Sequence, residues 1–149
     1  MKPERNKFVP ATGLTTEDLA PFIDGQVEVN SFSSRYVYVG EIDRAVVEGN
    51  QIRIGLSLVL NGERHPPFPK RWIRDDKRNS YIIDDLSKYT VADIGPGKEG
   101  GGCKWFLHSR TKSEFAILYP ADGRKFDARA VSLLTPVGEF SSGNGISVD

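Results

Sequence analysis

The chain has few of the residues that form covalent or metal cross-links. It has 149 residues, of which one is cysteine, Cys103, and two are histidine. One cysteine excludes an internal disulfide, and with two histidines it does not reach the four Cys or His ligands of a structural zinc site. A lone cysteine is typical of a reducing compartment. We therefore expect a cytoplasmic protein without a bound metal.

The sequence also lacks long apolar runs and an excess of charge of either sign. No stretch approaches the roughly 18 apolar residues of a membrane span, and residues 1–13 lack the apolar run of a signal peptide. The 20 basic side chains balance 20 acidic ones. This balance removes the long-range attraction to polyanions on which most non-specific nucleic-acid binding depends. We expect no membrane contact, and any nucleic-acid contact has to be local.

Alternation of apolar and polar residues is the clearest structural signal in the chain. From Ile52 to Leu60 every even position is a large aliphatic residue. This period of two predicts a β-strand with one buried face, which we expect to lie at the centre of the core. The preceding run, 36–47, predicts a second strand. Gly49 and Asn50 between the two runs are typical of a two-residue hairpin turn.

The register of this predicted hairpin raises a conflict. A regular ladder from the turn would place Asp43 and Glu41 on the buried face, where unpaired carboxylates are costly. One extra residue in the first strand removes the conflict. We therefore predict a β-bulge between Ile42 and Val47.

Shorter patterns predict the remaining elements. Thr15 and Asp18 have the spacing of a helix capping box, which predicts a short helix over 16–23. Alternating or β-branched runs bounded by turn residues predict further strands. These strands lie at 26–32, 89–94, 104–109, 114–119 and 130–134.

Many short antiparallel strands and one short N-terminal helix indicate an all-β fold with minor α content. We expect a small antiparallel β-barrel, or an SH3-like barrel or sandwich. The sequence shows no internal repeat and no second core. We assign residues 12–137 to one β-barrel domain, 1–11 to a flexible N-terminal segment and 138–149 to a flexible tail.

A glycine-rich stretch is the one pattern that could indicate a cofactor. Gly95, Gly97 and Gly100 have the spacing G-x-G-x-x-G after a predicted strand. In dinucleotide sites this motif leads into a helix whose N-terminus receives the phosphates. Here residues 104–109 have the period of a strand, and Pro96 removes one amide donor. We therefore expect a loop between two strands and no cofactor.

No set of side chains points to catalysis. Cys103 and His108 are an odd number of positions apart in a predicted strand, so their side chains point to opposite faces. A contact between Cys103 and His65 across the fold stays open. The adjacent aspartates lie in polar segments and are expected to be solvated. We favour a protein without enzymatic activity over a small enzyme of unknown reaction, which remains a remote alternative.

The most unusual segment is 64–78, which combines three prolines, two aromatic residues and a local charge of +4. Cations can hold acidic or phosphate groups, and rings can stack on apolar groups or bases. We therefore regard this segment as the candidate partner-binding site. Its candidate residues are Phe68, Lys70, Arg71, Trp72, Arg74, Lys77 and Arg78.

Several interpretations of this segment stay open. Because the net charge is zero, we favour a protein partner over single-stranded nucleic acid, which is the alternative. The letters PPFPKR also match a short ligand motif of proline-reading domains. In a structural interpretation, Phe68, Trp72 and Ile73 pack into the fold while Arg71 and Arg74 pair with nearby acids.

Overall fold

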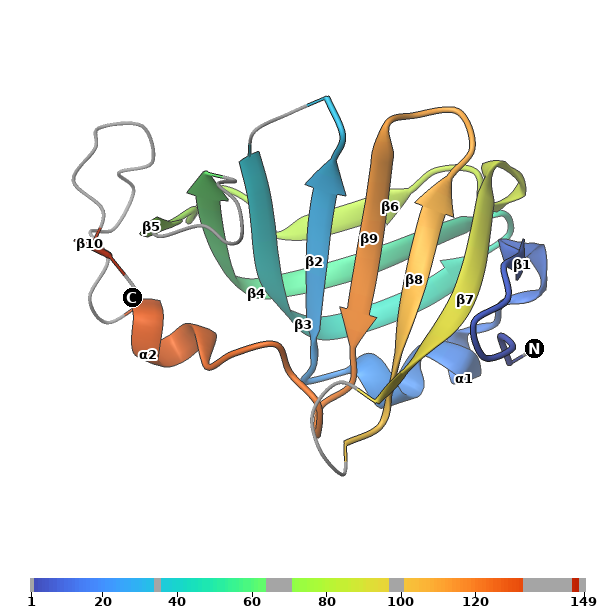
Figure 1. Cartoon of the computed structure of the whole chain (residues 1–149), viewed down its shortest axis with the longest axis horizontal. Helices are drawn as coiled ribbons and strands as arrows, with labels where there is room; N and C mark the ends of the chain where they lie inside the picture. Colours follow the sequence, from blue (N-terminus) through green and yellow to red (C-terminus); the bar gives the residue numbers. More distant parts are fainter. Residues whose placement is uncertain (1, 34–35, 64–70, 97–100, 133–145, 148–149) are drawn as a thin grey trace.

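The computed structural model describes residues 2–33, 36–63, 71–96, 101–132 and 146–147, most of them in antiparallel strands (Figure 1). The strands are β1 (Val9–Pro10), β2 (Gln26–Ser31), β3 (Tyr36–Glu48), β4 (Gln51–Glu63), β5 (Arg71–Arg74), β6 (Ser80–Ile83), β7 (Tyr89–Pro96), β8 (Cys103–Ser109), β9 (Glu114–Tyr119) and β10 (Ile146–Ser147). The helices are η1 (Ala11–Gly13), α1 (Thr16–Leu19), η2 (Ala20–Phe22), η3 (Leu86–Lys88) and α2 (Ala128–Ser132). The predicted all-β class is confirmed. None of the described helices has the length and apolar character to cross a bilayer.

The strands form one sheet that stays open. Its order is β1-β7-β8-β9-β2-β3-β4-β5-β10, and β6 pairs with the part of β4 that β5 leaves free. Among the described residues the two ends of this path do not pair, so the sheet does not close into the expected barrel. Strands β1 and β10 lie within the segments 1–11 and 138–149 that we assigned to flexible ends. The division into domain and ends stays a prediction.

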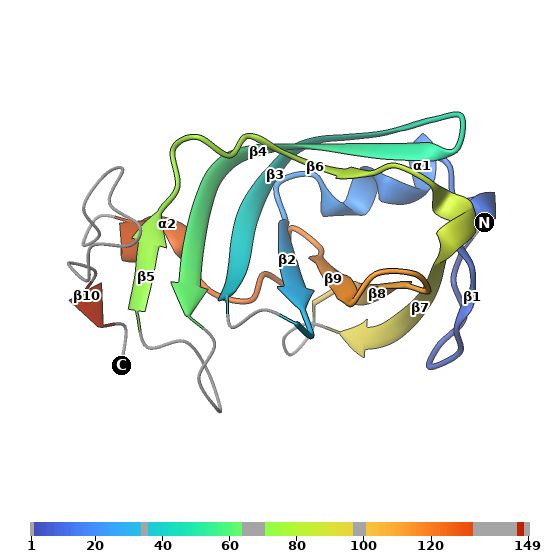
Figure 2. The ribbon, with the colours of Figure 1, turned by 90° about the horizontal axis from the view of Figure 1, so that it is seen from above.

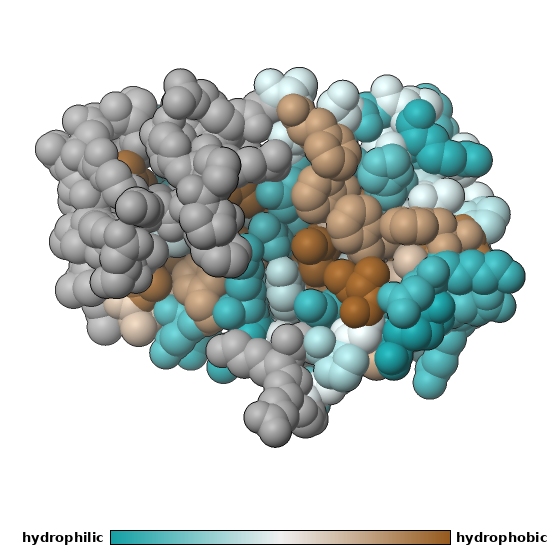
Figure 3. Space-filling model, viewed as in Figure 1, coloured by the Kyte–Doolittle hydropathy of each residue, from teal (hydrophilic) through white to brown (hydrophobic). Residues whose placement is uncertain are grey.

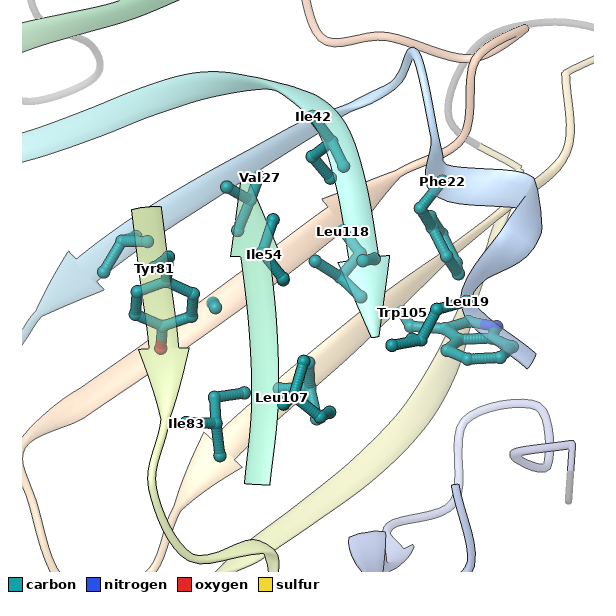
Figure 4. Packing of buried hydrophobic residues seen from close by; sticks show 14 of the residues in the cluster. Leu19, Phe22, Val27, Ile42, Ile54, Tyr81, Ile83, Trp105, Leu107 and Leu118 are labelled. Atoms are coloured by element: carbon teal, nitrogen blue, oxygen red, sulfur yellow. The ribbon is translucent and has the colours of Figure 1, made fainter. Parts of the chain in front are cut away.

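The sheet folds over itself, so that β4 and β6 face β7, β8 and β9 (Figure 2). The main core fills the space between the two halves (Figure 4). Val27, Ile54, Leu107 and Leu118 belong to it, and each is at most 1% exposed. Complete burial of such a side chain contributes about 1.5–3 kcal/mol before entropy is subtracted. This core holds the two halves of the sheet together.

A short helical segment closes one end of the folded sheet (Figure 1). The predicted capping box is confirmed: the Thr15 hydroxyl accepts from the Asp18 N–H, and the Asp18 carboxylate accepts from the Thr15 N–H. The α-helix ends at Leu19 and continues as a 3-10 turn, so it is shorter than predicted. In that turn Phe22 packs edge-on against Trp105, with ring centroids 4.8 Å apart.

A second apolar cluster lies on the outer face of the same sheet. Val39 and Leu60 belong to it together with Ala128 of α2. The strand that we predicted at 130–134 is wrong, because residues 128–132 form this helix. The Asp127 carboxylate caps this helix, because it accepts hydrogen bonds from two backbone N–H groups of the first turn. The helix packs on the part of the outer sheet face around β4 and β5.

The predicted β-bulge is confirmed. The register of the β3–β4 hairpin shifts between Ile42 and Arg44, so Asp43 has no partner on β4. Ile42 consequently pairs with Leu56 and faces the main core. Bulges of this kind bend a strand and increase its twist.

A second, unpredicted bulge lies in β4. Ser57 has no partner on β3, which restores the original register and places Glu41 opposite Leu58. The strand therefore changes faces: Leu56 lies in the main core, whereas Leu60 lies in the outer cluster. The expectation that all even positions from 52 to 60 share one face is wrong beyond residue 56.

Candidate functional site

The outer face of β8 and β9 carries rings where a sheet face that meets water usually carries polar side chains. On β8, buried Trp105 and Leu107 alternate with half-buried Phe106 and His108. On β9, half-buried Phe115 pairs directly with His108. The two strands therefore present three neighbouring rings on the face that points away from the main core.

Two more rings extend this face on both sides. Phe8 is 53% exposed and its ring centroid lies 5.6 Å from that of Phe106. Phe32 is 61% exposed and lies 5.0 Å from Phe115. Phe106 and Phe115 stack between them at 4.9 Å, with an interplanar angle of 12°. We call Phe8, Phe32, Phe106, His108 and Phe115 the aromatic surface, and Figure 3 shows a hydrophobic band in this region, across β9 and β8.

The aromatic surface lies on the part of the sheet that α2 leaves uncovered. The outer cluster on β3 and β4 packs against α2 and Phe126. By contrast, Phe8 and Phe32 remain more than half exposed. An aromatic side chain buries about 150–250 Å² when it is fully covered. A contiguous exposed patch of several such rings on a protein surface commonly marks an interaction site.

Two charged side chains on β8 and β9 are close to these rings. Lys104 shares their face of β8, and its Nζ lies 6.0 Å from the Tyr119 ring centroid. Glu114 accepts hydrogen bonds from the hydroxyls of Tyr81 and Tyr89, at 3.1 and 3.4 Å. Burial and then the Glu114 charge raise the pKa of Tyr89 to about 12. Glu114 is therefore engaged with tyrosines of the fold.

Buried polar side chains hold the segment after β9 against the sheet. Glu28 on β2 accepts from the Tyr119 hydroxyl at 2.7 Å and forms an ion pair with Lys125 at 2.9 Å. Gln26 accepts from the Lys125 N–H and donates to the Phe126 carbonyl. Burial alone would raise the pKa of Glu28, but Lys125 and Tyr119 outweigh it, and the pKa is lowered. These contacts fix the path of the chain toward α2.

Glu41 on β3 is the opposite case. Its Oε1 lies 3.8 Å from Nη1 of Arg124, and its buried Oε2 has no hydrogen-bond partner among the described residues. Burial therefore dominates and raises the pKa of Glu41. Two carboxyls with opposite pKa shifts are typical of an acid–base pair. Glu28 and Glu41 are, however, both buried, so we assign them a structural role.

The raised pKa of Glu41 makes the folded state less stable as the pH rises. The unfolded chain releases this proton near its ordinary pKa of about 4.3, whereas the folded chain retains it to higher pH. Glu41→Gln removes this titration. We expect the unfolding free energy of the variant, relative to wild type, to increase between pH 4 and pH 8, because only the wild type loses stability as Glu41 ionises. Urea denaturation at both pH values measures it, and a constant difference would contradict the raised pKa.

Of the first four candidate residues of the basic segment, only the Trp72 side chain lies within the described residues. Phe68, Lys70 and the Arg71 side chain lie outside the described residues. Trp72 is only 4% exposed, and its ring centroid lies 5.2 Å from that of Phe126. Trp72 therefore offers no open ring face to a partner, and its position matches the structural interpretation of the segment.

The remaining candidates lie at the surface, and two of them are paired. Arg74 contacts Asp76 at 2.9 Å, and Arg78 contacts Asp75 at 3.5 Å. These ion pairs reduce the positive potential that the sequence implied. Lys77 is exposed. Binding of a partner by this segment stays a prediction.

The residues considered for catalysis do not form a described site. Cys103 lies 3.3 Å from a guanidinium nitrogen of Arg5, whereas His108 belongs to the aromatic surface. His65 lies outside the described residues. Gly97 and Gly100 of the glycine-rich stretch also lie outside the described residues, between β7 and β8 in the chain. Within the described ranges, no three His, Cys, Asp or Glu side chains are grouped as metal ligands would be.

The chain matches no protein family model, no curated protein and no solved structure.

Proposed function

We propose that this chain is a non-catalytic cytoplasmic binding module that docks a protein partner on the aromatic surface. The supporting observation is the contiguity of its five rings, of which Phe8 and Phe32 are more than half exposed. Aromatic residues are enriched at the centre of protein–protein interfaces, where a few side chains contribute most of the binding energy. The uncovered rings have the composition of such a centre.

The packing of the rings favours a protein over single-stranded nucleic acid. Bases bind by stacking on open ring faces. Phe106 and Phe115 are nearly parallel and stack on each other, so part of each face is already occupied. Apolar side chains of a protein can pack on ring edges as well as on faces. The zero net charge also gives no long-range attraction to phosphates.

We propose the segment 64–78 as a second, polar contact with the same partner. It precedes and includes β5, which lies far from β8 in the strand order. Its exposed Lys77 can steer an acidic partner without a buried contact. Removal of such a peripheral charge changes the association rate and its salt dependence more than the affinity. The aromatic surface supplies most of the affinity in this proposal.

A site-specific photo-crosslinker tests the docking surface in cells. We would place p-benzoylphenylalanine at position 32, and at position 82 as the control. Ile82 is 44% exposed and lies on β6, in the other half of the folded sheet. We expect a discrete crosslinked protein from position 32 and not from position 82. Equal patterns from both positions would contradict docking on the aromatic surface.

A titration with a 12-nucleotide oligothymidine separates the two classes of partner. We expect no binding at micromolar protein, even at low salt. Binding that weakens steeply with salt and is lost in a Phe8→Ser/Phe32→Ser variant would assign the aromatic surface to nucleic acid instead.

A further inference from the structure

A pocket of about 460 Å³ lies at the end of the fold that η2 closes. Its walls come from η2, the start of β8 and the segment after β9, which meet at the lower end of the molecule in Figure 1. Small-molecule sites usually have volumes of about 300–1,000 Å³, with apolar walls and a few polar groups. The pocket belongs neither to the aromatic surface nor to the basic segment.

Aromatic and proline side chains form part of the wall. Phe22 and Trp105 pack edge-to-face at its base, with ring centroids 4.8 Å apart. Pro21 and Pro120 add rigid apolar surface. Trp105 is 7% exposed. Phe22 is 2% exposed, so most of both ring faces is covered by the protein, and the exposed part of the indole offers a limited apolar surface.

One carboxylate of the pocket is neutralised by the protein itself. The Asp93 carboxylate accepts from Arg5 Nε at 3.0 Å and from the Gly95 N–H at 2.8 Å. Arg5 also donates to the Cys103 sulfur at 3.3 Å. The negative charge of Asp93 raises the pKa of Arg5, which stays a cation. The negative charge of Asp93 is therefore already balanced by Arg5 on the pocket wall.

A second carboxylate is not neutralised in this way. Asp122 lines the same pocket, and its Oδ1 accepts only the Gly102 N–H, at 3.0 Å. Among the described residues it forms no salt bridge within 4.0 Å. A negative charge in a pocket with apolar walls complements an organic cation, because the carboxylate attracts the positive charge and the walls accept the apolar body.

We propose that this pocket binds a small organic cation, with its ammonium group beside Asp122 and its apolar body against Pro21, Pro120 and the exposed part of Trp105. The proposal rests on the pocket alone and is independent of the protein partner proposed above. Lys2 also lines the pocket and is exposed. Its ammonium group competes with the ligand for the same negative charge, so removal of this charge strengthens binding.

The lone cysteine provides a specific reporter of occupancy. Cys103 lines the pocket and is the only thiol in the chain. Its alkylation by the neutral reagent iodoacetamide is followed by mass spectrometry, with benzyltrimethylammonium as the probe ligand. We expect the probe to slow alkylation in a saturable manner at millimolar concentration. Benzyl alcohol, which has a similar ring and no charge, should protect at least tenfold more weakly.

Two variants test the charge assignment against a matched control. Asp122→Asn should weaken the protection by about tenfold, and Lys2→Ala should strengthen it severalfold. Asp84→Asn changes another exposed acid, which lies outside the pocket, and should leave protection unchanged. The proposal is overturned if the probe gives no saturable protection, if benzyl alcohol protects equally, or if Asp122→Asn behaves like wild type. None of these results bears on the aromatic surface, whose test uses position 32.

Discussion

Replacement of Gly25 by alanine should destabilise the protein by about 3 kcal/mol or more. A Cβ at this position would lie 2.0 Å from the Tyr119 carbonyl oxygen and 2.9 Å from that of Phe22. Both are backbone atoms, so no side-chain rotation relieves the clash. The Gly25 N–H donates to Phe22, and its carbonyl accepts from Ile42, which holds the residue in place. The close packing at this end of the fold therefore requires a residue without a side chain at position 25.

Gly49→Ala is the matched control for this prediction. Gly49 has a φ of +59° in the β3–β4 turn, and an added Cβ would have no neighbour within 4 Å. Only the left-handed backbone conformation opposes alanine there, at a cost of about 1–2 kcal/mol. Urea denaturation of both variants gives the comparison. Equal losses at the two positions would mean that the segment around Gly25 is looser than described.

Leu107→Ala should destabilise the protein by about 2–5 kcal/mol, because it leaves a cavity where the two halves of the sheet meet. Leu107 is 0% exposed and lies among the labelled core residues of Figure 4. Its neighbours come from several strands and cannot all move inward. Chemical denaturation with an unchanged m-value measures the loss.

Ile82→Ala is the control for the core variant. Ile82 is also an aliphatic strand residue, but it is 44% exposed on the outer face of β6. We expect this substitution to cost less than about 1 kcal/mol. A loss at Leu107 no larger than at Ile82 would contradict the two-layered core.

The elements that the sequence predicted correctly are those with a local signal. Strands β2, β3, β4, β7, β8 and β9 follow runs of alternating or β-branched residues, and Thr15 with Asp18 marks the start of α1. Strands β5 and β6 have only four residues each, too few for a period to appear. They form because the long strand β4 provides an edge with which each of them can pair. Their formation depends on partners distant in the sequence.

The prediction that all even-numbered side chains of β4 lie on one face of the sheet was wrong for a physical reason. Ser57 is an extra residue only relative to β3, and nothing in its own neighbourhood distinguishes it from a regular strand residue. Leu58 and Leu60 consequently face the outer cluster. The sequence did not predict this cluster, because the segment 130–134 was predicted to be a strand and not part of a covering helix. The burial of Glu41 has the same origin. A helix that covers the sheet makes both faces of a strand apolar.

The aromatic surface had only a partial signal in the sequence. On β8, Trp105 and Leu107 point one way and Phe106 and His108 the other, so both faces contain rings or aliphatic groups. Periodicity alone does not indicate which face meets the core. Phe8 joins this surface through tertiary packing, which no spacing in the sequence reveals. Basic and proline-rich composition instead drew attention to 64–78, where Trp72 proved to be buried.

The most direct test of the central claim is an equilibrium titration of the protein that crosslinks to position 32. The purified partner would be titrated with wild type, with Phe8→Ser/Phe32→Ser and with Ile82→Ser, after denaturation has shown that all three are folded. Loss of two exposed aromatic contacts at an interface centre typically costs more than about 1.4 kcal/mol, which is tenfold in affinity. We predict at least this weakening for the double variant and wild-type affinity for Ile82→Ser. Equal affinities for all three proteins would contradict docking on the aromatic surface.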